Sequence, residues 1–160
     1  MTTDRQRLEA VTIDDSMSAS SREAEHERQV AIFDLLQQNA FEPVEAPDGG
    51  PYALHLALND GRLELQIKGP GLGPGDERRH LLSMTPFKSI IKDYFLICES
   101  YDQAVRDASA AQIEAIDMGR RGIHNDGAEK LRERLEGKVT VDTDTARRLF
   151  TLICALHRRS

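Results

Sequence analysis

Apolar and polar residues alternate along parts of the first half of the chain, a pattern typical of strands. Residues 7–14 alternate weakly and lead into a serine-rich segment over 15–21, which predicts a short strand and a loop. Leucines alternate with small or polar residues over 52–58, and a similar run covers 63–67. The turn sequence Asn59-Asp60-Gly61-Arg62 between these runs predicts an antiparallel hairpin. A further short strand is expected over 79–84.

The spacing of apolar residues becomes helical over residues 21–39. Acidic residues crowd the start of this segment, where they suit the positive end of a helix dipole. We therefore expect a helix that packs five apolar residues on the core. These residues are Val30, Ile32, Phe33, Leu35 and Leu36.

Three further helices are expected in the second half. Thr85 is placed to cap free amides and Pro86 suits a first helical position, so one helix should begin here and run to about Arg106. Its apolar stripe is so wide that we place this helix in the centre of the fold. Ser109 and Gln112 form a capping-box pattern, which opens the next helix.

The last two helices are bounded by turn and capping residues. The helix that follows Ser109 either continues to Gly137 or ends at the turn sequence Asn125-Asp126-Gly127. Asp142 or Thr143 is placed to cap a final helix. The face of that helix expected to be buried comprises Ala146, Leu149, Phe150, Ile153 and Leu156.

Strands in the first half and helices in the second indicate an α+β fold. We expect a small antiparallel sheet covered by three or four helices. The length of 160 residues fits one domain, 1–160, with a sheet-rich part containing one helix over 1–84 and a helical part over 85–160.

The net charge of the chain and its distribution limit the classes of molecule that the protein is expected to bind. The net charge of -6 argues against general affinity for nucleic acid or an anionic membrane. Residues 1–77 hold 6 Lys and Arg against 15 Asp and Glu, whereas residues 78–160 hold 15 against 12. An anionic ligand is therefore expected to meet the second half.

The location of the protein is expected to be cytoplasmic. The sequence has no apolar run of about 18 residues and no basic start followed by an apolar segment, so neither a membrane span nor a secretory signal is predicted. Cys98 and Cys154 each lie in an apolar helical pattern without a second cysteine nearby. Both are interpreted as reduced core residues.

Several long segments resemble uncharacterised protein family 0262, a group of bacterial proteins. The resemblance covers nearly the whole chain and implies a bacterial cytoplasmic protein. It implies no activity and no catalytic residue, because the family carries no established function. The segments that carry it are Glu25–Arg28, Leu82–Phe87, Ile91–Tyr101, Gln112–Asn125 and Asp144–Leu152.

A polar stripe within residues 110–127 is the candidate ligand site. At 100° per residue, its members fall within about 100° of one another on a helix. Such a group of side chains can hold an anion and exchange a proton near neutral pH. Ion pairs within one helix explain the same residues as well or better. The stripe consists of Glu114, Asp117, Arg121, His124 and Asn125.

Arg120 is expected to point towards the core, where an unpaired guanidinium is costly. Asp93 or Glu99 on the preceding helix is its candidate partner, in a pair that fixes helix packing. Gly119 and Gly122 are expected to allow close packing on another side of the helix.

Other kinds of site are not predicted. The five histidines and two cysteines lack zinc-ligand spacing, and the glycine-rich segment 69–75 lacks the ending of a phosphate-binding loop. No metal or cofactor is therefore expected. The absence of tryptophan argues against a base-stacking surface, and Arg147-Arg148 is interpreted as solvated surface charge.

Three hypotheses about function follow. The first is a non-catalytic regulatory or binding protein that recognises a protein partner or an anionic metabolite, with Arg121, His124 and Asn125 at the contact. The second is an enzyme acting on a phosphorylated or carboxylated small molecule, with His124 as acid or base and Asp117 or Glu114 orienting it. The third is an obligate homo-oligomer whose subunits partly share the apolar faces of the last two helices.

Overall fold

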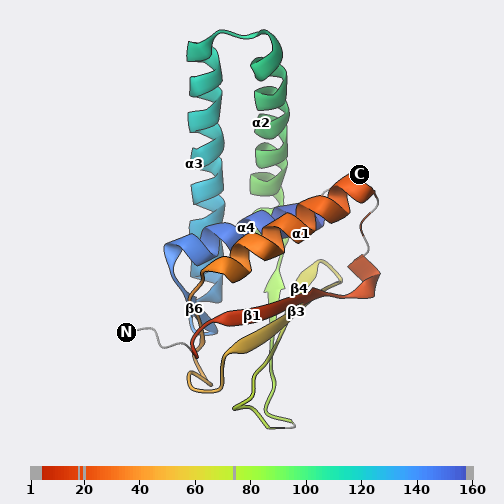
Figure 1. The fold of residues 1–160 in the computed structure, drawn as a ribbon, viewed down its shortest axis with the longest axis vertical. Helices are drawn as coiled ribbons and strands as arrows, with labels where there is room; N and C mark the ends of the chain where they lie inside the picture. The colour runs from red at the N-terminus through yellow and green to blue at the C-terminus, as the bar shows by residue number, and fades with distance from the viewer. Residues whose placement is uncertain (1–4, 18, 20, 74, 158–160) are drawn as a thin grey trace.

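The computed structural model describes residues 5–17, 19, 21–73 and 75–157. Figure 1 shows a small sheet, two helices that cross it and a long helical hairpin that projects from it. The strands are β1 (Leu8–Ile13), β2 (Phe41–Pro43), β3 (Tyr52–Asn59), β4 (Arg62–Lys68), β5 (Arg78–Ser83) and β6 (Val139–Val141). The helices are α1 (Arg22–Gln37), α2 (Lys88–Asp107), α3 (Ala110–Leu135) and α4 (Thr143–His157), with 3-10 turns η1 (Asp15–Met17) and η2 (Thr85–Phe87).

The main sheet has the strand order β1-β3-β4-β5. The expected hairpin is present as β3 and β4, with Asp60 and Gly61 at positive φ in its two-residue turn. β5 adds antiparallel to β4, but β1 lies parallel to β3. The α+β class is therefore confirmed, whereas the sheet is mixed rather than antiparallel. The intervening α1 and β2 supply the long connection that a parallel pair requires.

A second, two-stranded sheet joins distant parts of the chain. β2 pairs antiparallel with β6, so that Phe41 lies opposite Val141 and Pro43 opposite Val139. β2 follows α1 along the chain, and β6 lies between α3 and α4. All four of these residues are buried. This pairing fixes the end of α1 close to the start of α4.

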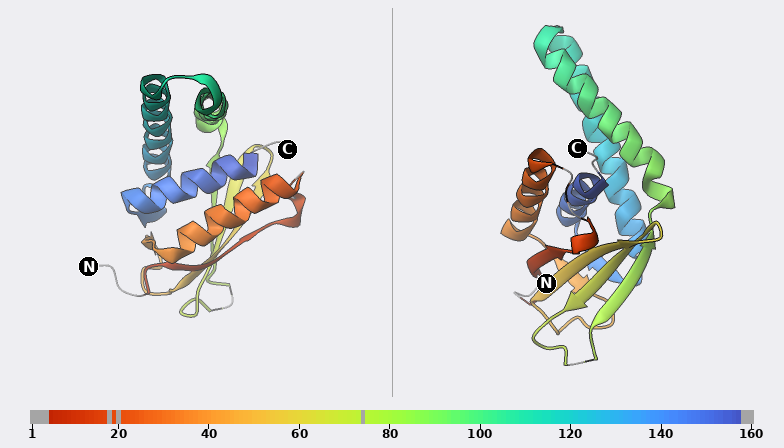
Figure 2. Two further views of the ribbon diagram at one scale, coloured as in Figure 1. Left: turned by 45° about the horizontal axis from the view of Figure 1, so that its top comes forward. Right: turned by 90° about the vertical axis from the view of Figure 1, so that its right-hand side faces the viewer.

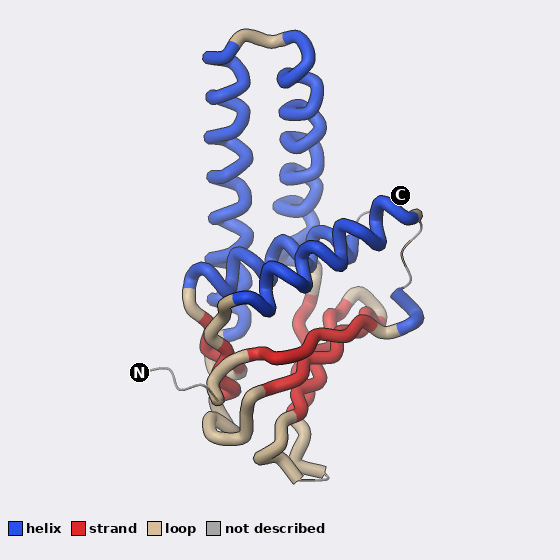
Figure 3. The backbone as a smooth tube through the Cα atoms, in the orientation of Figure 1, coloured by secondary structure: helices blue, strands red, loops and turns tan. Residues whose placement is uncertain are grey.

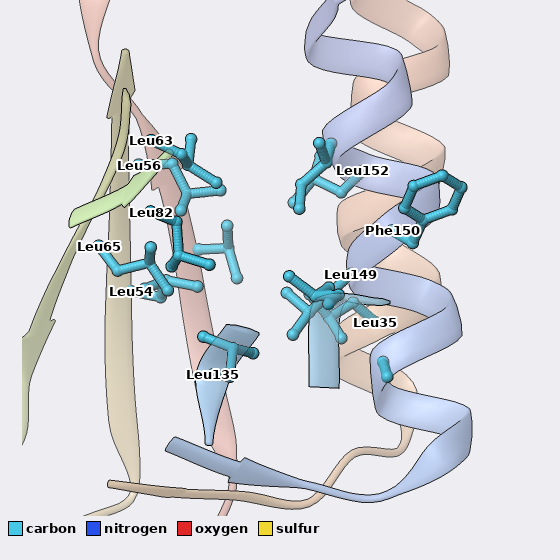
Figure 4. Close-up of a cluster of buried hydrophobic side chains, with 14 of the residues drawn as sticks. Leu35, Leu54, Leu56, Leu63, Leu65, Leu82, Leu135, Leu149, Phe150 and Leu152 are labelled. Atoms are coloured by element: carbon cyan, nitrogen blue, oxygen red, sulfur yellow. The ribbon is translucent and has the colours of Figure 1, made fainter. Parts of the chain in front are cut away.

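The core lies between the main sheet and the layer formed by α1 and α4. In Figure 4, leucines of β3, β4 and β5 point towards Leu35 of α1 and Leu149 and Leu152 of α4. The five residues predicted for the buried face of α4 are all buried. Asp142 caps this helix, because its Oδ1 accepts a hydrogen bond of 2.8 Å from the amide of Thr145. Figure 3 shows how the helical layer lies over the strands.

The buried face of α1 differs from the prediction. Leu35 is buried and Ile32 and Leu36 are half-buried, but Val30 is 44% and Phe33 63% exposed. A helix that lies on one layer buries a single stripe, here Ala24, Arg28, Ala31 and Leu35. Arg28 is accommodated because its guanidinium donates hydrogen bonds to the carbonyl oxygens of Met17 and Leu156.

The hairpin formed by α2 and α3 also departs from expectation. α2 was expected in the centre of the fold, but it packs chiefly on α3, and only Ile91 and Ala104 of its residues are buried. Figure 2 shows the hairpin extending away from α1 and α4. The wide apolar stripe of α2 therefore faces a single neighbouring helix and remains partly open.

The capping residues of the hairpin were predicted in part. The capping box at Ser109 and Gln112 is present, with mutual hydrogen bonds of 3.2 and 3.1 Å. Thr85 does not cap α2, because residues 85–87 form a 3-10 turn and the helix begins at Lys88. α3 runs without a break through Gly127 to Leu135, so the turn sequence at 125–127 does not end the helix. Gly127 instead allows close packing against Phe150 of α4.

Candidate functional site

The predicted polar stripe lies along the projecting part of α3 and does not form one site. Glu114 and Asn125 are exposed, and their separation of 11 positions corresponds to about 16 Å of helix. Asp117 lies between two arginines of the same helix, with an ion-pair distance of 2.5 Å to Arg120 and 3.1 Å to Arg121. This part of the stripe is an intrahelical network.

Arg120 is placed by the same network. Besides its pair with Asp117, its guanidinium carbon lies 3.9 Å from the ring centroid of Tyr101, a cation–π contact with α2. Asp93 and Glu99, its candidate partners, are both exposed on α2. Arg120 thus contacts α2 through the ring of Tyr101. The carboxylate that balances its charge, Asp117, lies on its own helix α3.

His124 is the member of the stripe that reaches the body of the protein. Its ring centroid lies 5.5 Å from that of Tyr94 on α2 and 5.4 Å from that of Phe150 on α4. Its Nε2 lies 2.7 Å from Oγ1 of Thr151, also on α4. The imidazole is therefore held where the hairpin joins the helical layer.

The hydrogen bonds around Thr151 assign the tautomer of His124. The Thr151 hydroxyl donates to the carbonyl oxygen of Arg147 at 3.1 Å, so its lone pairs remain to accept from the imidazole. His124 accordingly carries its proton on Nε2, and Nδ1 keeps a lone pair. Burial, together with the positive charge of Arg147, lowers the pKa of His124 below its usual value. The neutral imidazole is thus favoured near pH 7.

A shallow pocket of about 280 Å³ opens beside this imidazole. Arg148 is tied to the end of α1, because Nη1 donates to the carbonyl oxygen of Gln38 at 3.1 Å. Within the described part of the chain, no carboxylate lies at ion-pair distance from the half-buried Arg147. The pocket is lined by His124, Asp144, Arg147, Arg148 and Thr151. We call it the His124 pocket.

The arginines of the His124 pocket were not predicted as site residues. Arg147 and Arg148 were interpreted as solvated surface charge because no local pattern relates them to His124. Their proximity depends on the crossing of α3 and α4, where Gly127 meets Phe150. A helical wheel of either segment alone contains no signal for this contact.

Elsewhere in the described structure, the predicted site residues do not come together in a second site. A larger groove of about 640 Å³ runs beside α1 and includes His26 and Val30, but it shares only Thr151 with the His124 pocket. Among the described residues, no three His, Cys, Asp or Glu side chains are grouped as metal ligands. Within that same part, no helix is both long and apolar enough to cross a membrane.

The fold and the pocket define a small α+β protein with a basic hollow at the root of a projecting helical hairpin. Residues 5–159 match the uncharacterised protein family UPF0262, and the chain belongs to this family. It is 60% identical to a UPF0262 protein of Caulobacter vibrioides over 154 residues, which cover 96% of this chain and 94% of that relative.

Other relatives show similar agreement. A UPF0262 protein of Agrobacterium fabrum is 58% identical over 153 residues, with 96% of both chains covered. One of Phenylobacterium zucineum is 56% identical over 156 residues, with 97% of this chain and 95% of the relative covered. No solved structure matches this chain.

Proposed function

We propose that this protein is a non-catalytic binding protein of the bacterial cytoplasm that recognises a small anionic ligand in the His124 pocket. The observation that carries the proposal is Arg147, a half-buried guanidinium with no carboxylate partner in the described structure, beside a neutral histidine. A carboxylate or phosphate would supply the missing counter-charge in a paired hydrogen-bond geometry. The two free cysteines are consistent with a reducing compartment.

The rigidity of the pocket supports recognition. His124 is fixed by two aromatic rings and Thr151, and Arg148 is fixed by the carbonyl oxygen of Gln38. Side chains held in this way lose little conformational freedom when a ligand binds. A bound anion would also favour the protonated imidazole, so that binding is coupled to proton uptake by His124.

The geometry favours binding over acid–base catalysis. The enzyme hypothesis requires Asp117 or Glu114 to orient His124, but Asp117 pairs with Arg120 and Arg121 and Glu114 is exposed. The hydrogen-bond partner of His124 is instead the hydroxyl of Thr151. A threonine hydroxyl orients an imidazole without stabilising its protonated form as a carboxylate does.

Thermal unfolding of the purified protein with inorganic phosphate, pyrophosphate or citrate tests this function. A probe at 100 times its dissociation constant should stabilise the protein by about 2.7 kcal/mol. Arg147→Gln should abolish the shift, whereas Arg134→Gln, which removes an exposed arginine at the far end of α3, should retain it.

Three outcomes would contradict the proposal. If none of the three anions shifts unfolding at millimolar concentration, the pocket does not select this class of ligand. If Arg121→Ala removes the shift and Arg147→Gln does not, the ligand contacts the polar stripe of α3 instead. Equal losses in Arg147→Gln and Arg134→Gln would indicate a general charge effect.

A further inference from the structure

A pocket of about 400 Å³ lies between α1 and the edge strand β1. β1 runs below α1 in Figure 1. On the helix, Glu25, Gln29 and Ile32 line the pocket, and their spacing of four and three residues places them along one flank. No residue of the described structure lines both this pocket and the His124 pocket. We call it the Arg28 pocket, because Arg28 also lines it.

Arg28 brings a buried positive charge to this pocket. The residue is 5% exposed, and Nη1 and Nη2 donate hydrogen bonds to the carbonyl oxygens of Met17 and Leu156. A guanidinium has N–H donors on every nitrogen, and Nε of Arg28 has no acceptor in the described structure. Among the described residues, no carboxylate lies at ion-pair distance from Arg28. Burial of a guanidinium without a counter-charge is costly.

The guanidinium of Arg28 forms part of the pocket wall. Met17, whose carbonyl oxygen accepts the hydrogen bond from Nη1, lines the same pocket. The bond from Nη2 to Leu156 of α4, at 3.3 Å, holds the other side of the group. The positive charge is therefore fixed in position by two neutral oxygen atoms, and neither of them balances it.

Glu25 has the spacing of an ion-pair partner for Arg28 but does not pair with it. The same i, i+3 spacing joins Asp117 to Arg120 at 2.5 Å on α3. Arg28 instead turns towards η1 and α4, whereas Oε1 of Glu25 accepts a hydrogen bond of 2.8 Å from Gln29. The pocket thus contains a carboxylate and a guanidinium that are about one helical turn apart and do not neutralise each other.

The other charged residues of the pocket are acidic. Asp14 and Asp15 directly follow β1 and line the pocket together with Glu25. Asp14 also lies 3.5 Å from Nε2 of His55. These carboxylates repel a ligand that carries only negative charge, and a ligand that carries only positive charge leaves Arg28 without a counter-charge. The pocket therefore favours a ligand that carries both charges close together.

The rest of the wall that bears on the ligand is apolar. Val11 and Met17 are buried, and Ile13 and Ile32 are half-buried. Apolar ligand surface that lies against these side chains is removed from water, which favours binding. The pocket volume of about 400 Å³ lies in the range of small-molecule sites.

We propose that the Arg28 pocket binds a free α-amino acid with an apolar side chain. The ligand carboxylate accepts hydrogen bonds from the unused N–H groups of Arg28, and the ligand ammonium donates to Glu25 and Asp15. Both charged groups of an α-amino acid are attached to one carbon atom, which suits the short separation of Glu25 and Arg28. The apolar side chain lies against Ile13 and Ile32. This site is separate from the anion site proposed for the His124 pocket.

NMR titration of isotope-labelled full-length protein with L-leucine tests the site and the ligand class together. Saturable changes in amide shifts should be confined to residues 11–17 and 25–32, and residues 144–151 should not respond. Two analogues each remove one charge, since isocaproate lacks the ammonium and isoamylamine lacks the carboxylate. Each should bind at least about tenfold more weakly than L-leucine.

Glu25→Gln tests the contact with the ammonium. This substitution keeps the shape of the side chain and removes its charge, so the affinity for L-leucine should fall at least about tenfold. The preference for L-leucine over isocaproate should disappear as well. Asp34→Asn is the matched control, because this exposed residue points about 180° round α1 from Glu25 and should not affect binding. Equal losses in the two variants would indicate a general charge effect and overturn the proposal.

Arg28→Met tests the contact with the carboxylate. An apolar side chain of similar length removes the buried charge, so the fold should persist while L-leucine binding is lost. If this variant does not fold, Glu25→Gln and the two analogues still decide the question. Arg147→Gln should bind L-leucine as the wild type does, so the two proposed sites succeed or fail separately.

Three results would overturn the amino-acid site. The first is the absence of shift changes with L-leucine at millimolar concentration. The second is equal affinity for L-leucine and isocaproate, which would show that the ammonium is not recognised. The third is a response confined to residues 144–151, which would place the ligand in the His124 pocket.

Discussion

Gly127 of α3 lies directly against the ring of Phe150 on α4. A Cβ atom built on this glycine would be 2.2 Å from Cζ of the phenylalanine and 2.5 Å from both Cε atoms. Phe150 is fully buried and its ring also contacts His124. The position of the His124 pocket therefore depends on a residue without a side chain.

We expect Gly127→Ala to lower the free energy of unfolding by about 1–3 kcal/mol, because the added methyl group overpacks a closed core. Urea denaturation monitored by circular dichroism measures this change. Gly122→Ala is a matched control on the same helix, since a Cβ there meets nothing within 4 Å. It should stabilise the helix by up to about 1 kcal/mol. A neutral Gly127→Ala would show that the two helices are not in close contact.

The stability of the protein should fall as pH decreases through the range of histidine titration. His124 has a lowered pKa in the folded protein because of burial and Arg147, whereas its value in the unfolded chain is near 6.5. Its contribution is therefore complete above about pH 6.5 and is lost as pH falls towards the folded value. His124→Gln should reduce this slope in urea titrations at successive pH values.

His80 provides the comparison for that experiment. Burial, with smaller effects of Lys138 and Arg78, also lowers its pKa, so His80→Gln should reduce the slope independently. A slope unaffected by His124→Gln would show that the imidazole is not desolvated at the root of the hairpin.

Glu64 of β4 should stabilise the sheet only in its charged form. Its carboxylate accepts hydrogen bonds from Gln66 at 2.8 Å and Asn59 at 3.1 Å, and it lies 2.6 Å from Nε of Arg79. The bond from Gln66 and the pairing with Arg79 lower its pKa. The stabilisation is present above about pH 4.5 and is lost as pH falls through the lowered value.

Glu64→Gln should therefore lower the melting temperature at neutral pH, and the difference from wild type should shrink in acid. Glu77→Gln, at an exposed position just before β5, is the control and should change little. A Glu64→Gln effect that is constant with pH would point to packing rather than charge.

The two thiols should differ in reactivity. Cys154 is 3% exposed and Cys98 is half-buried, and burial raises the pKa of both. In the folded protein an aromatic disulfide reagent should modify Cys98 slowly and Cys154 only through unfolding. Cys98→Ser should remove the earlier phase. Modification of Cys154 at the same rate as Cys98 would contradict the packing of α4.

Much of the local structure could be predicted because its signals lie within a few residues. The turn at Asn59–Arg62 and the capping box at Ser109 specify their conformations through their own side chains. The parallel pairing of β1 and β3 could not be predicted, since it depends on how α1 returns the chain to the sheet. The placement of α2 failed for a related reason. Its wide apolar stripe predicted a helix in the centre of the fold. In the described structure α2 packs chiefly on α3, and only Ile91 and Ala104 of its residues are buried.

The candidate site was predicted only as far as helical periodicity allows. His124 was selected by its spacing and lies beside a pocket, but the same spacing selected Glu114 and Asn125, which are exposed. Arg147 and Thr151 reach His124 through the crossing of α3 and α4, which neither helix encodes alone. Arg28 was missed because a charged residue on a buried stripe is stabilised only by carbonyl oxygens supplied from η1 and α4.

The position of α4 has a consequence for the order of events during synthesis. The leucines of β3 and β4 and Leu35 of α1 leave the ribosome well before residues 143–157, which complete their core. Until α4 is made, these side chains have no native cover, and the carbonyl oxygen of Leu156 that receives Arg28 does not yet exist. The core between the sheet and the helical layer therefore cannot close before α4 has left the ribosome.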